Sequence, residues 1–220
     1  MSGVIRIFHE NNAFFLGRVG KHAVVLCMCS MGGSGRDSAQ IVTGEVLRFW
    51  RPSALILVGV AFGRDTERQK IGDVLVSEQI IPYEPERVGS ESTVPRGQAL
   101  LPGVRLYNSF RNADIDWCFR NPNGLLCAPH FGPILSGQKL IDNSDFKSCF
   151  FEKHPNAIGG EMEGVGVATC AEREKCEWIL VKAICDWADG KKTDDHHGFA
   201  AASAVSFICH VLSQPGAVQD

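Results

Sequence analysis

Residues 159–190 read GGEMEGVGVATCAEREKCEWILVKAICDWADG. Two glutamates, Glu161 and Glu163, stand near the start of this stretch, and Asp186 follows the mostly apolar run from Trp178 to Cys185. A run of this length and composition predicts a buried strand, and the segment before it predicts a helix. Because ligands of open α/β sheets bind beyond the carboxyl ends of the strands, the stretch predicts a site around its acidic residues.

The rest of the chain alternates between segments of strand and helix character. Such alternation indicates a mostly parallel or mixed sheet flanked by helices, so we expect an α/β fold of this kind. The predicted strands are a hairpin of 13–16 and 22–28, then 54–60, 73–81, 125–128, 134–135 and 178–185; the predicted helices are 38–50, 145–152, 162–175 and one from 201 onward; and 85–104 is predicted to be a long loop.

The composition indicates one soluble domain that handles small molecules. The chain has 220 residues, 45% of them hydrophobic, and this length suits a single buried core over residues 1–220. The formal net charge is -3 and the basic residues are scattered, which predicts neither nucleic acid nor a membrane as a partner. No apolar run approaches the roughly 18 to 20 residues that span a bilayer, and no signal peptide is evident, so we expect a cytoplasmic protein.

The nine cysteines are an odd number, and none is spaced as CxxC. Most lie in apolar runs, so we expect reduced thiols that pack as small hydrophobes; the alternative is a redox-sensitive pair at Cys27 and Cys29. Residues 194–197, Asp-Asp-His-His, are of metal-binding types. Adjacent histidines seldom hold one ion together, however, and acidic pairs often cap helices. We therefore expect no metal and no cofactor.

Asp186 has the position of a general acid. Cleavage of an N-glycosidic bond requires stabilisation of an oxocarbenium-like sugar and protonation of the departing base, by analogy with glycoside hydrolysis. A carboxylic acid that is partly withdrawn from water can hold a proton near neutral pH and donate it to that base. The alternative is that Asp186 only fixes the turn after the strand, since aspartate is common in turns.

Only one of Glu161 and Glu163 needs to point into a pocket, because residues two apart share a face in a strand but not in a helix. A helix that begins near Met162 places Glu163 in its first turn, where the helix dipole favours a carboxylate. An ionised glutamate can accept hydrogen bonds from the hydroxyl groups of a ribose. The alternative is an ordinary first-turn glutamate that stabilises the helix.

Residues 30–38, SMGGSGRDS, follow a predicted strand and open a predicted helix. Glycines such as Gly33 let backbone N–H groups approach an anion, and Arg36 adds a positive charge. The segment is neither a Walker loop nor a full GxGxxG motif. The alternative is a plain glycine-rich turn that is capped by Asp37 or Ser38.

Together, these motifs resemble those of the nucleoside phosphorylase and nucleosidase superfamily, which includes purine and uridine phosphorylases and methylthioadenosine/S-adenosylhomocysteine nucleosidases. Residues 159–164 resemble the ribose-binding motif of the family. Residues 183–189 resemble its base-binding motif, with Cys185 where the family often has serine. The resemblance implies a single-domain three-layer α/β sandwich around a mixed central sheet, phosphorylase-type, that assembles into a homo-oligomer.

The resemblance also implies a role for each motif residue. Asp186 would protonate a purine, adenine in particular, Glu163 would bind the ribose hydroxyls, and Met162 would pack beneath the sugar. The sequences of the two motifs resemble most those of an immune-effector subgroup, some members of which hydrolyse ATP to adenine and ribose 5'-triphosphate. Arg36 and Arg64 would then hold a 5'-polyphosphate. The predicted substrate-binding set also contains Glu161, Gly33 and Gly59.

Two departures from the family pattern bear on the reaction. Family nucleosidases begin with a strand that carries a water-activating glutamate, whereas here only Glu10 precedes the first hairpin, so the chain looks short at its N-terminus. Phosphorylases usually have arginine and serine around the glycine of 58–60, where this chain has Leu57 and Val60. We predict N-glycosidic bond cleavage that releases adenine from a nucleotide or nucleoside, with ATP as a candidate substrate. The alternatives are a phosphate-dependent purine nucleoside phosphorylase, and an inactive nucleotide-binding or oligomerisation module of a larger immune-type protein.

Overall fold

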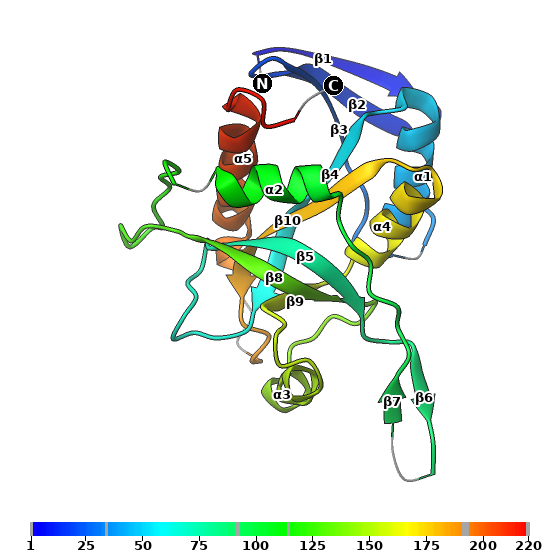
Figure 1. The fold of residues 1–220 in the computed structure, drawn as a ribbon, viewed down its shortest axis with the longest axis vertical. Helices are drawn as coiled ribbons and strands as arrows, with labels where there is room; N and C mark the ends of the chain where they lie inside the picture. Colours follow the sequence, from blue (N-terminus) through cyan, green and yellow to red (C-terminus); the bar gives the residue numbers. More distant parts are fainter. Residues whose placement is uncertain (1, 34, 91–92, 114, 191–193, 219–220) are drawn as a thin grey trace.

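The computed structural model describes residues 2–33, 35–90, 93–113, 115–190 and 194–218. Its N-terminal part is an antiparallel sheet in the order β1 (Ser2–His9), β2 (Asn12–Val19) and β3 (His22–Cys27). Strands β2 and β3 form the predicted hairpin, which turns at Gly20 with a φ of 55°, a left-handed conformation that costs glycine little. This sheet lies at one end of the molecule (Figure 1).

A sheet of five strands forms the centre of the fold. Strand β10 (Glu177–Asp186) pairs in parallel with β4 (Ala54–Gly63) and antiparallel with β5 (Val74–Pro82), so the sheet closes as a barrel. Strands β9 (Gly159–Glu161) and β8 (Pro129–Ser136) complete the circle between β4 and β5. Strand β8 runs parallel to β5 and β9, whereas β4 and β9 are antiparallel. The predicted mixed sheet is therefore confirmed.

Helices cover this sheet on two sides. Successive side chains of a strand point to opposite faces, and apolar side chains on both faces of β10 are buried under helices. On one side lie α1 (Ala39–Trp50) and α4 (Gly164–Arg173), and on the other lie α2 (Val104–Asn112) and α5 (His197–Ser213), as Figure 1 shows. Of the side chains of β10, Trp178, Leu180 and Ile184 pack in the core with α1 and α4, whereas Ile179, Val181 and Ala183 pack in the core with α2 and α5.

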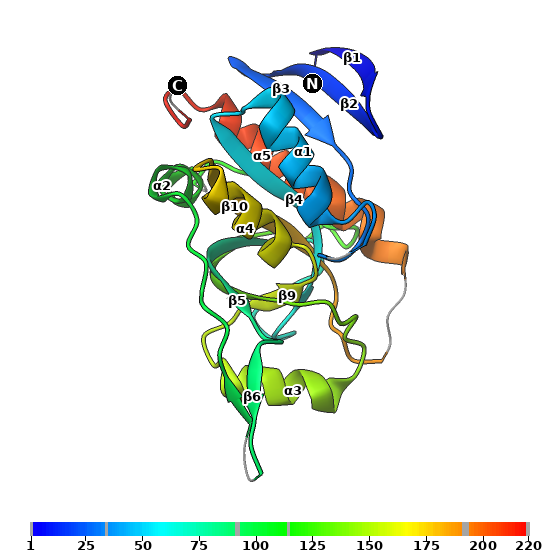
Figure 2. The ribbon, with the colours of Figure 1, turned by 90° about the vertical axis from the view of Figure 1, so that its right-hand side faces the viewer.

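Two smaller elements lie at the end of the molecule opposite the β1–β3 sheet (Figures 1 and 2). One is α3 (Ser144–Lys153), which begins after Asn143, and the Oδ1 atom of Asn143 accepts a hydrogen bond from the N–H of Phe146 (2.8 Å). The other is the pair β6 (Glu86–Val88) and β7 (Thr93–Pro95). A 3-10 turn, η1 (Asp194–His196), precedes α5. None of the helices in the described part of the chain combines the length and apolar composition needed to cross a bilayer.

Several elements differ from the sequence expectations, among them β1 and β9, which were not predicted. The segment 85–104, predicted to be a loop, contains β6 and β7. Helix α2 was not predicted, although it buries Leu106 and Phe110 at the helical spacing of four. The prediction of a strand at 125–128 is wrong, and only Leu126 forms an isolated bridge there. The side chain of Asn121 accepts hydrogen bonds from the N–H groups of Asn123 and Leu125, and these local bonds hold the backbone in a turn.

Candidate active site

A cavity of about 370 Å³ lies where β4 and β10 end. Its wall is formed by the second half of β4, the end of β10, the junction of β9 and α4, the segments after β3 and β8, and the start of α5. Apolar side chains, among them Val60, Phe62 and Ile141, cover much of this wall. Pockets of roughly 300 to 1,000 Å³ with an apolar wall and a few polar groups are typical sites for small organic ligands.

Glu163 borders this cavity from the N-cap position of α4. Its Oε1 atom accepts a hydrogen bond from the N–H of Gly32 (2.8 Å), and its Oε2 atom accepts one from Nζ of Lys182 (2.8 Å). Burial acts to raise the pKa of Glu163, but the positive charge of Lys182 and the hydrogen bonds from Lys182, Gly32 and Met162 outweigh it and lower that pKa below 4.5. Glu163 is therefore ionised at neutral pH, and a carboxylate retains lone pairs for further donors.

Lys182 is the centre of a buried ion-pair network. Its Nζ atom lies 2.8 Å from Oε2 of Glu163 and 3.5 Å from Oε2 of Glu161, and its side chain is 4% exposed. Burial acts to lower the pKa of Lys182, but the two negative charges prevail and raise it above its ordinary value. Gly59, which pairs with Lys182 across the sheet, leaves the room for this side chain, because a Cβ atom at Gly59 would lie 3.0 Å from Nζ.

The carboxylate of Glu161 binds the backbone of the protein itself. It accepts hydrogen bonds from the N–H groups of Glu163 and Gly164 at 2.9 to 3.0 Å, at the beginning of α4. Glu161 thus supplies the negative charge at the positive end of this helix, which the sequence analysis had assigned to Glu163. Glu161 borders the cavity but is only 4% exposed, so Glu163 is the better placed of the two for a ligand.

Asp186 borders the cavity at a β-bulge near the end of β10. The register between β10 and β4 shifts between Ile184 and Asp186, and such bulges re-aim side chains at the ends of strands. Oδ1 of Asp186 accepts a hydrogen bond from the N–H of Ala188 (2.9 Å), and the thiol of Cys185 donates to Oδ2 (3.1 Å). Asp186 therefore fixes the turn after the strand and also borders the cavity, so the two interpretations of the sequence do not exclude each other.

Two backbone N–H groups of the glycine-rich loop donate hydrogen bonds to side chains of the protein itself. The N–H of Gly32 donates to Glu163, and the N–H of Gly33 donates to Oε1 of Gln138 (3.1 Å). Gly32 has a φ of 91°, which residues with a side chain rarely adopt. Ser34, in the middle of this loop, lies outside the described residues. The loop therefore contributes to the site by positioning Glu163.

The structure brings Met162 to the cavity with Glu161, Glu163 and Asp186, but the other predicted binding residues do not line it. Arg36 is exposed on the loop whose first residues, Ser30 and Met31, do line it. Arg64 donates to the carbonyl oxygens of 155 and 157, and its guanidinium lies 5.1 Å from the ring centre of Phe151. Gly33 and Gly59 are placed to support Gln138 and Lys182, as described above.

Glu10, the first acidic residue of the chain, does not line the cavity. It lies in the turn between β1 and β2 with a φ of 49°, and its side chain is 63% exposed beside His9. Among the described residues that line the cavity, the acidic ones are Glu161, Glu163 and Asp186.

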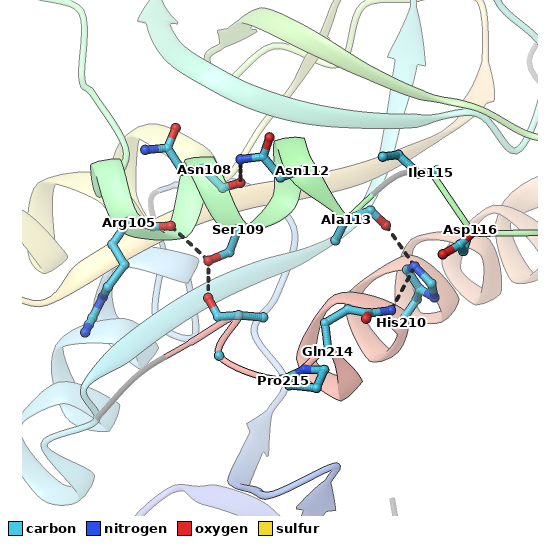
Figure 3. A pocket seen from close by; sticks show the side chains of 12 residues that line it. Arg105, Asn108, Ser109, Asn112, Ala113, Ile115, Asp116, His210, Gln214 and Pro215 are labelled. Carbon is cyan, nitrogen blue, oxygen red and sulfur yellow. Dashed lines mark hydrogen bonds between the residues drawn. The ribbon is translucent and has the colours of Figure 1, made fainter.

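A larger hollow, of about 580 Å³, lies between α2 and the C-terminal end of α5 (Figure 3). Several of its polar groups have partners in the protein itself. Ser109 Oγ lies within hydrogen-bond distance of the carbonyl oxygens of Arg105 and Ala217, and Nε2 of His210 is hydrogen-bonded to the carbonyl oxygen of Ala113 (2.8 Å). None of the residues predicted from the sequence to bind or to catalyse lines this hollow. We therefore take the smaller cavity as the candidate active site.

Among the polar residues of the cavity wall, Lys182 and Lys139 were not considered from the sequence, and Cys29 and His197 were considered only in other roles. A lysine inside an apolar strand is a usable signal, because lysine is almost never fully buried without a partner. Burial raises the pKa of the Cys29 thiol, and the negative charge of Glu163 adds to this. All nine cysteines are free thiols, so Cys27 and Cys29 are not joined to each other.

Comparison with known proteins identifies relatives over most of the chain. The family model described as "Phosphorylase superfamily" matches residues 4–214. The chain is 32% identical over 233 residues to the Death domain-containing ATP nucleosidase of Amphimedon queenslandica, covering 95% of this chain and 43% of that protein. It is 24% identical over 206 residues to the ATP nucleosidase Cap17 of Escherichia coli, covering 84% of this chain and 41% of that protein. The chain thus spans less than half the length of these two relatives.

A solved structure shares the fold. The 5'-methylthioadenosine/S-adenosylhomocysteine nucleosidase from Neisseria meningitidis, in complex with methylthio-immucillin-A, matches with a TM-score of 0.80 and 19% sequence identity. The match covers 97% of this chain and 90% of that chain. At this identity the likeness concerns the fold, and it confirms the phosphorylase-type α/β architecture that the sequence predicted.

Proposed function

This chain belongs to the phosphorylase superfamily, and we propose that it is an N-glycosidase that hydrolyses ATP to adenine and ribose 5'-triphosphate. The observation that carries the proposal is that Glu163 and Asp186, which come from different elements, border one cavity of nucleoside size. The choice of ATP is supported by the names of two relatives, both ATP nucleosidases, one of which aligns with 95% of this chain.

In the proposed reaction the two carboxyl groups act on opposite parts of the substrate. The ribose hydroxyls donate hydrogen bonds to the ionised Glu163, whose negative charge stabilises the positive charge that develops on the sugar. The glycosidic bond breaks with its electron pair passing to the purine, and Asp186 gives its proton to purine N7. Water then adds to the sugar carbon and releases a proton, which restores the acid form of Asp186. Met162 packs beneath the sugar.

The attacking water requires little activation in this scheme. The transition state resembles an oxocarbenium ion, so the bond to the base is largely broken before the bond to water forms. We therefore propose that the reaction proceeds without a counterpart of the water-activating glutamate, since Glu10 lies outside the cavity. Phosphate is not a co-substrate in this proposal.

The 5'-triphosphate would extend out of the cavity toward two exposed basic side chains. Lys139 lines the cavity and Arg36 extends from the glycine-rich loop, and both are exposed. Arginine and lysine are the usual partners of phosphate groups. We expect Arg36→Ala to lower kcat/KM for ATP more than for adenosine. The matched control is Arg111→Ala, which removes an exposed arginine of α2 that does not line the cavity. An unchanged ratio of ATP to adenosine turnover would exclude the role of Arg36.

Product analysis with several substrates tests the central proposal. ATP, AMP, adenosine, methylthioadenosine and inosine are incubated with the protein, with and without phosphate, and free base is quantified by chromatography. We expect adenine from ATP without added phosphate, and a loss of about 10²-fold or more in Asp186→Asn. Asp145→Asn, at an exposed position of α3, is the matched control. Failure to release base, undiminished release by Asp186→Asn, or a requirement for phosphate would contradict the proposal.

A further inference from the structure

Three metal-binding side chains converge on one side of the candidate active site. Cys185 and Asp186 stand at the end of β10, and His197 is the first residue of α5. The Sγ atom of Cys185, a carboxylate oxygen of Asp186 and a ring nitrogen of His197 all lie within 4.8 Å of one another. All three residues line the cavity. Residues 194–197, the run of metal-binding types in the sequence, contribute only His197 to this cluster, and its two partners come from β10.

The β-bulge is what brings the first two side chains together. In a regular strand, neighbouring residues point to opposite faces, so Cys185 and Asp186 would be apart. The shift of register between Ile184 and Asp186 cancels this alternation, and Sγ of Cys185 lies 3.1 Å from Oδ2 of Asp186. Two donor atoms at this separation already have the spacing of neighbouring ligands around one small cation. A ring nitrogen of His197 lies within 4.8 Å of both atoms, so a small shift completes the set at usual metal–ligand distances of about 2.0–2.3 Å.

The types of ligand define the class of ion. A thiolate and an imidazole select borderline-soft divalent ions such as Zn²⁺ over Mg²⁺ and Ca²⁺, which prefer sets of oxygen ligands. Three protein ligands with a water molecule in the fourth position are a common arrangement for zinc at a site that faces a cavity. We propose that Cys185, Asp186 and His197 form a binding site for Zn²⁺ or a similar divalent ion within the nucleotide cavity. Binding releases the thiol proton of Cys185 and the carboxyl proton of Asp186 to solvent, because the thiolate and the carboxylate are the ligands.

Occupancy of this site is inhibitory. The ion takes the carboxylate of Asp186, which then neither holds nor donates the proton that the departing adenine requires. This consequence rests on the proposed function, whereas the binding of the ion does not. The site thus makes the glycosidase sensitive to free zinc through Cys185.

Cobalt titration tests the binding directly. Co²⁺ substitutes for Zn²⁺, and a bond between Co²⁺ and thiolate gives a charge-transfer absorption that is independent of enzyme activity. The reduced, metal-free protein is compared with Cys185→Ser, His197→Gln and His196→Gln. The last variant is the matched control, because His196 is exposed, adjacent in sequence and outside the cluster. Circular dichroism establishes that each variant is folded. Because Cys185→Ser and His197→Gln change different elements, a loss of binding in both is not explained by a local folding defect in one of them.

We expect one Co²⁺–thiolate site in the protein and in His196→Gln that is competed by Zn²⁺. We expect an affinity at least about tenfold lower in Cys185→Ser and His197→Gln, since changes even behind the ligands cost about 10- to 100-fold. Equal affinity in all four proteins would place the ion on other cysteines and overturn the proposal. So would the absence of a thiolate band in the unaltered protein.

An activity measurement then tests inhibition. Adenine release from ATP is followed with increasing Zn²⁺, and each protein is compared with its own rate in the presence of a chelator. We expect the unaltered protein to be inhibited reversibly, and Cys185→Ser to require at least about tenfold more Zn²⁺. Equal sensitivity of the two proteins would refute the inhibitory role. If the chelated protein released no adenine, the proposed function would fail, and the cobalt titration would still decide the metal site.

Discussion

Replacement of Lys182 by methionine is expected to destabilise the protein by about 3–5 kcal/mol. The ammonium group lies 2.8 Å from Glu163 and 3.5 Å from Glu161, and the side chains of the lysine and the two glutamates are 4%, 13% and 1% exposed. At an effective dielectric constant of about 20, unit charges at 2.8 Å attract each other by about 6 kcal/mol. Desolvation of the ions offsets part of this attraction. Methionine preserves most of the packing but leaves two buried carboxylates without a counter-charge, which is the main cost.

Lys153→Met is the matched control for this substitution. Lys153 also lies 2.8 Å from a carboxylate, that of Glu86, but the two side chains are 38% and 25% exposed. Water screens this pair, so the same substitution is expected to cost no more than about 1 kcal/mol. Urea unfolding of both variants at neutral pH, followed by tryptophan fluorescence, measures the two free energies. Equally small losses in the free energy of unfolding would refute the reasoning that burial makes the Lys182 ion pairs important for stability.

Three further substitutions have defined outcomes. Glu163→Gln is expected to make the loss of stability in acid less steep. Folding lowers the pKa of Glu163, so the ionised carboxylate stabilises the protein fully above pH 4.5, and this stabilisation is lost as the pH falls through the lower pKa of the folded state. Urea unfolding midpoints across this pH range measure the difference. Gly160→Ala is expected to cost about 1–3 kcal/mol, because its Cβ atom would collide with the ring of Phe62; an unchanged thermal midpoint would speak against this close packing. Asp186→Asn is expected to lower kcat for ATP by about 10²- to 10⁴-fold while Kd for a non-hydrolysable nucleoside analogue changes little, and parallel losses in both would point to a binding role instead.

The elements with clear periodicity were predictable from the sequence. The hairpin of β2 and β3, helices α1, α3, α4 and α5, and strands β4, β5 and β10 all lie where apolar spacing predicted them, with boundaries that differ by a few residues. Helix α2 was missed because most of its residues are polar and only Leu106 and Phe110 face the core. The barrel closure was also missed, since it depends on β10 pairing with β5 and not on the pattern of either strand.

The candidate site was predictable in part. The motif residues Glu163 and Asp186 do border one cavity. Their spacing could not show that Glu161 binds the backbone at the start of α4 while Glu163 is the better placed of the two glutamates for a ligand. That division depends on the position at which α4 begins and on the location of Lys182, both of which are tertiary features. The positions of Arg36 and Arg64 outside the cavity wall are equally a result of loop packing, which local sequence does not encode.

The hydrogen bond between Gly32 and Glu163 connects residues that are 131 positions apart in the chain, and Lys182 joins them from a third segment. Contacts across such separations form late in folding, because a long loop must be closed before the contact can compensate for the lost entropy. We therefore expect the carboxylate of Glu163 to reach its place only after the N-terminal sheet and β10 have both docked. A chain that is still emerging from the ribosome would therefore have no ordered Glu163 carboxylate, and the candidate site would form only after the residues of β10 have been synthesised.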